Sequence, residues 1–541
     1  MNLRALVPAF LVSAVVGAGE RERSRLAELR ANWGREIARK RNLEVISRYH
    51  ASAAAGRRTV DERTWQDLGL DDLFGKLDRT VSMPGRQVLY HQLRTYEEGD
   101  GPLAERARQQ AVFKDEPELR EKLQLLFSRL DGPRSEWLAS SLLVPIPTAP
   151  RFAPLLYLCS FLSLAGLVGM IFVHWLFLPL LPLLLVNVAI TATYGQRVTP
   201  SFSGFAQIVT MLGVGERLAA MANPRALPQL EALKEKMPAL RRLQRRLGWL
   251  VMDRAALPDL AESLLGYLNM LFLFDIVVYL RSIAALRQHQ PALLELFEAI
   301  GALDSAIAVA SYLQGAAVVT RPGLVAGRHL EFSGLYHPLI AAPVSNALQL
   351  TGRSALIAGP NMAGKTAFIR SVGINVILAQ TLGFAHAEHA RLPRATVRSA
   401  IRREDDLNSG QSYFFAEIRQ ILEFTQAEEA GGLNLFLIDE IFRGTNTVER
   451  VAASAAVLHH LGRHHLVLAT THDVELQDLL ADAFDMYHFS DRVADGTYSF
   501  DYRIHPGPAR SRNAIKLLEI SGYPAAIIRE AEALAARASR G

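Results

Sequence analysis

The sequence predicts an α/β domain in the C-terminal part of the chain, after an all-α region into which a long apolar helical hairpin is inserted. Three observations lead to this prediction. Residues 325–505 alternate short apolar runs with helical stretches and turn residues, as α/β domains do. Residues 200–313 instead carry apolar residues at helical spacing. Residues 152–196 contain no Lys, Arg, Asp or Glu.

Composition sets broad limits. A chain of 541 residues should form several domains. The 59 basic and 54 acidic residues leave a net charge of +5. This mild basic excess permits contact with nucleic acid or an anionic membrane surface but establishes neither. The one cysteine, Cys159, excludes an intrachain disulfide and lends no support to export into an oxidising compartment.

The N-terminal segment, residues 5–18, is apolar and is followed by alternating Glu and Arg at 20–23. It is shorter than the about 20 residues that span a bilayer. A signal-like segment, an interfacial anchor and the remnant of a membrane helix all fit it. A nucleotide-binding motif further along the chain disfavours a cleaved export signal, so we favour a membrane anchor.

The uncharged run at 152–196 is long enough for two membrane-spanning helices with a tight turn at His174 and Trp175. The turn lacks Lys and Arg, whereas arginines flank both ends of the run, and this places both ends in the cytoplasm. The flanking arginines are Arg134, Arg151 and Arg197. The alternative is a buried helical hairpin in a soluble core. Residues 264–280 are also apolar, but Asp275 favours a buried core helix over a third span.

A phosphate-binding loop is indicated at residues 359–366, which follow an apolar strand at 354–358 and precede a helix at 366–380. The loop has the pattern Gly-x4-Gly-Lys-Thr, with glycines that let backbone N–H groups surround phosphate oxygens. The alternative is a Gly-rich turn before a helix. The candidate nucleotide-binding residues are Gly359, Pro360, Asn361, Met362, Ala363, Gly364, Lys365 and Thr366.

Within this loop, Lys365 would contact the outer phosphates of ATP, and Thr366 would offer its hydroxyl to Mg2+. A second apolar strand, 433–438, ends in Asp439 and Glu440. Asp439 is placed to hold Mg2+, and Glu440 to orient or deprotonate the attacking water. The sequence therefore predicts an ATPase site with Thr366 and Asp439 as metal ligands.

Two further segments belong to the predicted site. His472 follows the strand-like run 466–469 and could hydrogen-bond the terminal phosphate, although a surface or satisfied histidine is the alternative. Ser409, Gly410 and Ser412 precede a helical stretch and suit either a second anion-facing helix N-terminus or an ordinary N-cap loop.

These motifs together resemble those of the MutS family of mismatch-repair ATPases. The matching segments are residues 77–86, 335–339, 359–366, 409–414, 439–447, 469–472 and the tail 513–531. The resemblance covers roughly residues 70–135 and 225–535. The family usually has Gly where Ala363 stands.

The resemblance implies a homodimer with two composite sites for ATP and Mg2+. Loop residues of one subunit, Lys365 and Thr366 among them, would bind ATP together with Ser409, Gly410 and Ser412 of the other. Asp439 would hold Mg2+, Glu440 would activate water and His472 would read the γ-phosphate. The tail would form a helix–turn–helix dimerisation element.

The chain also departs from the family pattern. Too few residues precede the helical core to hold the family's mismatch-reading and connector domains, and we find no Phe-x-Glu wedge motif of the kind that stacks on a mispaired base. The apolar hairpin stands where the family has lever helices that end in a DNA clamp. We therefore expect a membrane-associated branch of the family.

The expected segments follow from these motifs. They are 1–63, an apolar segment and charged helix; 64–150, the first part of a helical MutS-like core; 151–197, a transmembrane hairpin; 198–324, the second part of the core; 325–505, an α/β P-loop ATPase domain of the ABC/MutS-like kind; and 506–541, the dimerisation tail.

We expect an ATP-dependent protein at the cytoplasmic membrane, with its ATPase domain facing the cytoplasm, that acts on duplex or branched DNA in mismatch repair or recombination. The alternative is a membrane-anchored ATPase switch with an unidentified protein client. An ABC half-transporter is disfavoured, because two or three spans are too few for a transport pathway.

Overall fold

The structure is a computed structural model of the 541-residue chain. It describes residues 9–144, 146, 148–221, 229–248, 267–360, 362–401, 413–428, 431–442, 446–494, 497–509, 515, 518 and 522–538. The chain divides into two compact units. Unit 1 comprises residues 1–55, 76–91 and 107–315, and unit 2 comprises residues 56–75, 92–106 and 316–541.

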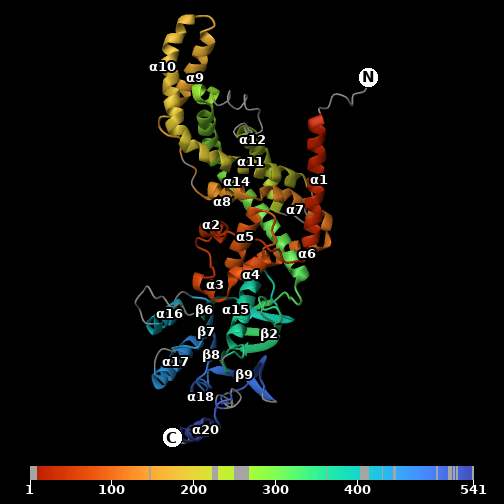
Figure 1. Ribbon diagram of the computed structural model, residues 1–541, viewed down its shortest axis with the longest axis vertical. Helices are drawn as coiled ribbons and strands as arrows, with labels where there is room; N and C mark the ends of the chain where they lie inside the picture. Colours follow the sequence, from red (N-terminus) through yellow and green to blue (C-terminus); the bar gives the residue numbers. More distant parts are fainter. Residues whose placement is uncertain are drawn as a thin grey trace. The chain divides into compact units, whose positions relative to one another are not determined.

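Unit 1 is helical (Figure 1). Its elements are α1 (Ala9–Asn32), α2 (Leu43–Ala53), α5 (Met83–Arg94), α6 (Asp100–Asp115), α7 (Pro117–Phe127), η2 (Ser128–Leu130), η3 (Pro133–Glu136), α8 (Trp137–Leu143), α9 (Ala153–Gly169), η4 (His174–Leu176), α10 (Phe177–Ile190), η5 (Thr191–Gly195), α11 (Gln196–Ala220), α12 (Gln229–Gly248) and α14 (Phe274–Gly315). Helices α5 and α6 continue past the boundaries of unit 1.

The core of unit 1 forms around α14, a helix of 42 residues. Leu293, Leu296, Phe297 and Ile300 recur at helical spacing along it and are fully buried. Burial of each such side chain stabilises the fold by about 1.5–3 kcal/mol. The helical region expected from the periodicity of residues 200–313 is therefore present wherever the structure describes that range.

Helices α9 and α10 form a hairpin (Figure 1), as the sequence predicts, with the turn at η4. Their apolar side chains are largely exposed: Ile171 is 79% exposed, Phe172 82% and Trp175 70%. The stretch His174–Tyr194 is long and apolar enough to cross a bilayer, and the neighbouring apolar helix Ala153–Gly169 is shorter. Membrane insertion of the hairpin remains a prediction.

Polar side chains inside the hairpin bind the backbone just before α14. Asn187 donates from Nδ2 to Ser163 Oγ (2.8 Å) and to the Leu271 carbonyl (2.6 Å). Ser160 donates to the Phe272 carbonyl (2.6 Å). The helical stretch before α14 ends at Leu273, which has φ +55°. Over the described residues 267–280, the core helix expected over residues 264–280 is therefore divided at Leu273, and hairpin side chains bind the carbonyls just before the break.

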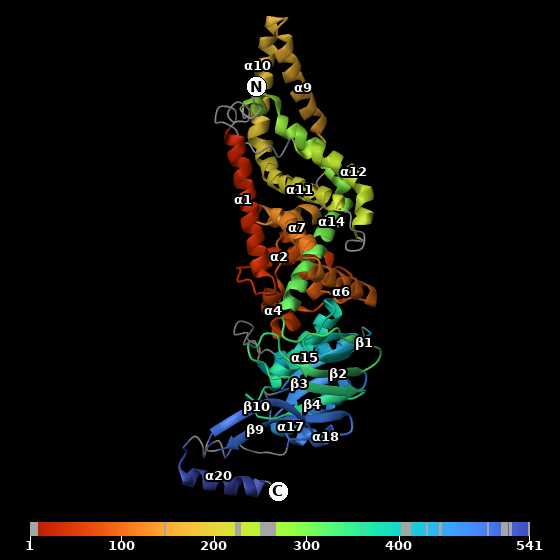
Figure 2. The ribbon, with the colours of Figure 1, turned by 90° about the vertical axis from the view of Figure 1, so that its right-hand side faces the viewer.

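Unit 2 contains two sheets, shown in Figure 2 together with α17 and α18. Its strands are β1 (Gly323–Val325), β2 (His329–Leu335), β3 (Asn346–Thr351), β4 (Ser354–Ala358), β5 (His389–Pro393), β6 (Ala395–Ala400), β7 (Leu433–Asp439), β8 (Leu466–Thr471), β9 (Phe484–Ala494) and β10 (Thr497–Pro506). Its helices are α3 (Glu62–Asp67), α4 (Leu70–Leu77, which ends beyond unit 2), α15 (Lys365–Thr381), α16 (Tyr413–Glu428), α17 (Thr447–Gly462), α18 (Glu475–Leu479) and α20 (Ala525–Ala538).

The larger sheet has the strand order β10-β9-β4-β8-β7-β6. Strands β9, β4, β8, β7 and β6 run parallel to their neighbours, and β10 is antiparallel to β9. All residues of β4 and β8 are buried, as expected for central strands of a parallel sheet. The carboxyl ends of β4, β8 and β7 therefore meet at one edge, where open parallel sheets bind ligands.

The second sheet has the order β1-β5-β2-β3, in which β2 is antiparallel to both β3 and β5. Residues 56–75 of unit 2 contact the edge of the larger sheet: Ser399 of β6 donates to Asp67 (2.6 Å), as does the Ile401 N–H (3.0 Å). In the expected dimerisation tail, the second helix is α20, whereas most of the first helix lies outside the described residues.

Candidate functional site

The loop that the sequence assigns to phosphate binding lies between β4 and α15, as predicted. Gly359 and Gly364 have φ +144° and +107°. A Cβ on Gly359 would lie 2.7 Å from the Phe489 carbonyl oxygen, so this position requires glycine. Met362 also has a positive φ, +69°. Helix α15 therefore begins directly after a loop whose backbone conformation requires glycine at two positions and strains Met362 at a third.

Lys365, the first residue of α15, is buried, at 4% exposed. Its Nζ donates to the Gly359 carbonyl and to the Pro360 carbonyl (3.3 Å). The ammonium group is thus held over the phosphate loop, where an anion bound by the loop would meet it. Ala363 is fully buried, so the position where the family usually has Gly tolerates a methyl group here.

Asp439, the last residue of β7, faces the start of α15. Its Oδ2 accepts a hydrogen bond from Thr366 Oγ1 (2.8 Å), and its Oδ1 accepts one from Thr470 Oγ1 (2.5 Å). A carboxylate and a hydroxyl oxygen side by side are ligands that Mg2+ accepts beside phosphate oxygens. The two predicted metal ligands are therefore brought together from positions far apart in the sequence.

Glu440 directly follows Asp439 and is buried, at 7% exposed. Its backbone has φ +59°, a strained conformation for a non-glycine residue. Its carboxylate contacts the Nε2 atom of His472 and lies 3.9 Å from Lys365 Nζ. Lys365 Nζ also lies 3.3 Å from both ring nitrogens of His472. The predicted base, histidine and lysine thus form one cluster.

His472 comes directly after β8, which ends at Thr471. The next residue, Asp473, accepts two hydrogen bonds from Arg450, at 3.0 and 2.7 Å. The hydrogen bond to Asp473 is the largest cause that raises the pKa of Arg450. This bidentate pair ties α17 to the segment that carries His472. Arg450 was not predicted, because no motif in the sequence marks it.

A cavity of about 410 Å³ opens beside the phosphate loop. Its walls include Pro360, Met362 and Lys365 from the loop and helix. They also include residues that were not predicted to bind nucleotide: His337, Val344, Asn346, Phe368 and Tyr502. The volume falls in the usual range for small-ligand sites. Its apolar and aromatic lining next to a phosphate loop suits the base and sugar of a nucleotide.

Tyr502 reaches this cavity through an irregularity in β10. The register with β9 shifts between Phe500 and Ile504, and Tyr502 has φ +55°. Asn346 holds the bulge from β3, because its Nδ2 donates to the Tyr502 carbonyl (3.1 Å) and its Oδ1 accepts from Ile504 N–H (2.8 Å). Nothing in the local sequence around Tyr502 signals this bulge.

Four of the predicted site residues, Asn361, Ser409, Gly410 and Ser412, lie outside the described residues. The others that carry predicted chemistry, Lys365, Thr366, Asp439, Glu440 and His472, meet at the edge of the larger sheet.

Comparison with known proteins supports the resemblance seen in the motifs. The family model of MutS domain V matches residues 355–538. The DNA mismatch repair protein MutS of Thermus thermophilus is 32% identical over 220 residues, which are 40% of this chain and 27% of that protein. The protein of the same name from Streptococcus sanguinis is 30% identical over 263 residues, 46% of this chain and 30% of its own length.

The chain therefore spans about 30% or less of the length of these two relatives. The matched family region contains the phosphate loop, Asp439, Glu440 and His472. Through this C-terminal domain, the chain is similar to proteins of the MutS family.

Proposed function

We propose that unit 2 binds ATP with Mg2+ and hydrolyses it, and that the chain uses this cycle as a membrane-tethered MutS-like protein. The observation that carries the proposal is the meeting of five groups at one sheet edge: the Lys365 ammonium, the Thr366 hydroxyl, the Asp439 and Glu440 carboxylates and the His472 ring. Each group matches a role that phosphoryl transfer to water needs.

The loop and Lys365 would hold the β- and γ-phosphates, and the cavity lined by His337 and Tyr502 would hold the nucleoside. Thr366 and Asp439 would hold Mg2+, which when bound neutralises charge on the phosphate oxygens. Glu440 would accept the proton of the attacking water, with His472 and Lys365 orienting its carboxylate.

ATP binding and turnover by the purified full chain test this assignment. We expect Lys365→Ala to weaken ATP binding by about 10²-fold or more, because it removes the charge that faces the phosphates. Glu440→Gln should bind ATP normally yet lower kcat by about 10²–10³-fold, because the amide cannot accept the proton. Glu388→Gln, an exposed matched control away from the cavity, should change neither. Normal turnover by Glu440→Gln would refute the role of this base.

We further propose that ATP sites form between two copies of the chain and that the client is DNA. The two relatives described above are named DNA mismatch repair proteins, and the mild positive charge of this chain suits a polyanion. Gel-shift titration with homoduplex, mismatched and branched DNA, at stated salt concentrations, tests the DNA part. Absence of binding to all three at physiological salt would favour the alternative of a protein client.

The proposed location is the cytoplasmic membrane, with the ATPase domain facing the cytoplasm. The α9–α10 hairpin supports it, because exposed side chains such as Phe161, Ile171 and Phe172 form an apolar surface that lipid would cover. The same hairpin favours a second candidate function, an ATPase switch that acts on a membrane protein. ATP-dependent crosslinking to one specific membrane protein would support this second function.

A further inference from the structure

A pocket of about 560 Å³ lies in unit 1, where the N-termini of α2 and α5 meet. Four of its lining residues are cationic: Arg39, Lys40, Arg41 and Arg86. Among the described residues that line the pocket, Glu136 is the single acidic one. Two helix N-termini add partial positive charge at the same place. None of these residues belongs to the ATP site proposed above.

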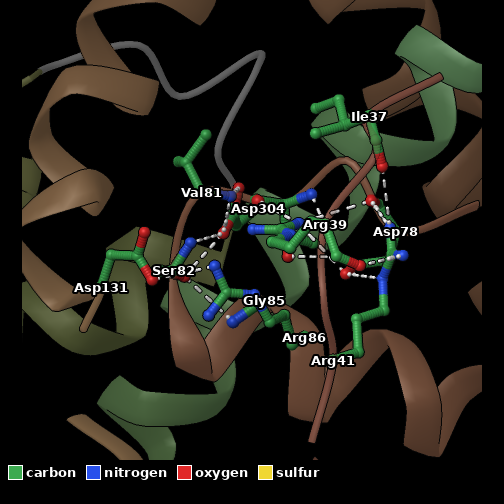
Figure 3. Close-up of polar contacts among 11 residues, drawn as sticks. Ile37, Arg39, Arg41, Asp78, Val81, Ser82, Gly85, Arg86, Asp131 and Asp304 are labelled. Carbon is green, nitrogen blue, oxygen red and sulfur yellow. Dashed lines mark hydrogen bonds and ion pairs between the residues drawn. The ribbon is translucent and has the colours of Figure 1, made fainter. Parts of the chain in front are cut away.

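Two carboxylates, Asp78 and Asp131, hold three of these cations in place (Figure 3). Asp78, whose side chain is fully buried, accepts hydrogen bonds from Arg39 Nη2 (3.1 Å) and Arg41 Nε (2.8 Å). Arg86 Nη2 donates to Asp131 (2.9 Å). Because one carboxylate serves two guanidinium groups, a surplus of positive charge remains at Asp78.

Two of the guanidinium groups keep spare donors. Within the described part of the chain, no hydrogen-bond partner reaches the buried Nε of Arg39 or of Arg86, and Arg86 is only 7% exposed. Burial lowers the pKa of Arg39 most, Asp78 opposes this, and the charges of Arg86 and Arg41 lower it further. Like charges are thus packed together around the pocket, an arrangement that a bound anion would stabilise.

Hydrogen bonds to α14 fix the backbone at the start of α5, the helix that carries Arg86. Asp304 of α14 accepts hydrogen bonds from the N–H of Val81 and from the N–H and Oγ of Ser82 (Figure 3). A Cβ on Gly85 would lie 2.1 Å from Asp304 Oδ2, so only glycine permits this approach. The turn that places Arg86 is therefore fixed by α14, the core helix of unit 1.

We propose that this pocket binds a phosphorylated small molecule with at least two phosphates, of nucleotide size. Arginine and lysine side chains in a fixed frame bind phosphate oxygens by charge-assisted and bidentate hydrogen bonds. The volume fits a small organic ligand, and Leu43, Ile46 and Met83 form an apolar wall for its organic part.

The proposal is tested by measuring, with calorimetry, the binding of inorganic pyrophosphate to the full chain in detergent. The Lys365→Ala background removes the strongest competing phosphate site. We expect saturable binding that Lys40→Glu and Arg86→Gln each weaken by about tenfold or more, and that Glu136→Gln strengthens. Lys122→Glu, the same charge change at an exposed position of unit 1 outside the pocket, should leave the affinity unchanged within about twofold.

Lys40 is exposed, so Lys40→Glu keeps the test decisive if Arg86→Gln does not fold. ADP and dihexanoyl phosphatidylinositol 4-phosphate, which each carry two phosphate groups, are tested in competition with pyrophosphate and distinguish a soluble nucleotide from a lipid phosphate as the source of the group. Loss of pyrophosphate affinity in Lys40→Glu but not in Lys122→Glu supports the site. No pyrophosphate binding, or equal affinity in the Lys40→Glu and Lys122→Glu proteins, overturns it.

Discussion

Thr366 Oγ1 donates a hydrogen bond to Asp439 Oδ2 over 2.8 Å, which joins the first turn of α15 to the end of β7. Thr470 of β8 donates to the other oxygen of the same carboxylate. The Asp439 carboxylate therefore connects α15, β7 and β8 at the edge of the larger sheet. This geometry places a hard oxygen ligand beside the phosphate loop, where a nucleotide-bound Mg2+ would lie.

Asp439→Ala should abolish the dependence of ATP binding on Mg2+ and lower hydrolysis by about 10²-fold or more, because the site loses its carboxylate ligand. Nucleotide binding in EDTA should persist, since Lys365 and the loop remain. Fluorescent-ATP titration with and without Mg2+ measures both effects. Asp478→Asn, on the surface-exposed side of α18, is the matched control. Undiminished Mg2+ dependence in Asp439→Ala would contradict the ligand assignment.

Complementation between two inactive variants tests the composite site. Lys365→Ala removes the loop function of one subunit, and Ser412→Arg blocks the segment proposed to complete the partner's site. If sites form between subunits, each mixed dimer keeps one intact site, and an equimolar mixture regains about a quarter of wild-type turnover. If each subunit forms its site alone, mixing restores nothing. Turnover of the mixture, compared with that of each variant alone, decides between the two arrangements.

Gly359→Ala should weaken nucleotide binding by about tenfold or more, because the new methyl group would meet the Phe489 carbonyl at 2.7 Å and displace the loop. Gly99→Ala is the control, since a Cβ there meets nothing within 4 Å. The thermal midpoint of each variant, with and without nucleotide, separates loop displacement from global destabilisation. Equal affinity for nucleotide in the two variants would show that the loop accommodates the Cβ.

Asp304 should make stability depend on pH. Burial raises its pKa from 3.8 to about 6, despite hydrogen bonds from Ser82 and Val81 that lower it. A carboxyl group with a raised pKa in the folded state binds its proton more tightly than in the unfolded state. Its contribution is therefore fully present below pH about 4 and is lost as the pH rises through about 6.

The measurement compares the wild-type chain with Asp304→Asn by urea denaturation across this pH range. The free energy of unfolding of wild type, relative to the variant, should fall by about 3 kcal/mol between pH about 3.5 and about 6.5. Asp115→Asn, an exposed control, should give a curve parallel to wild type. Parallel curves for Asp304→Asn and wild type would contradict the raised pKa.

The hairpin should place its turn on the outer face of the membrane. In a Cys159→Ser background, we expect Phe172→Cys, at the exposed turn, to react with a membrane-impermeant maleimide in intact cells. Lys122→Cys, on α7, should react only after permeabilisation, because the proposed orientation places the helical core on the cytoplasmic side. Labelling of Phe172→Cys only after permeabilisation, or release of the chain by carbonate washing, would argue against a spanning hairpin.

Much of the site could be predicted because its chemistry lies in contiguous motifs at strand ends. The strand at 354–358 has the predicted bounds, and the strands before Asp439 and His472 are each present, extended by one or two residues. Local patterns carry this information, since an apolar run followed by glycines or acids marks the carboxyl end of a buried strand. The position of Tyr502 at the cavity could not be predicted, because a bulge in β10 produces it. The pair of Arg450 with Asp473 could not be predicted either, because it is a contact between separate elements.

The sequence by itself determined the nature of the proposed nucleotide site, because the phosphate loop, the two acids and the histidine each have a local signature. It also determined that an apolar hairpin interrupts the helical region. Only the tertiary structure decided that Thr366 and Thr470 both donate hydrogen bonds to the Asp439 carboxylate, since parallel pairing of β7 with β8 brings distant residues to one edge. It also decided that Arg39, Arg41 and Arg86 gather in one pocket, because the turn before α5 must fit against Asp304 of α14.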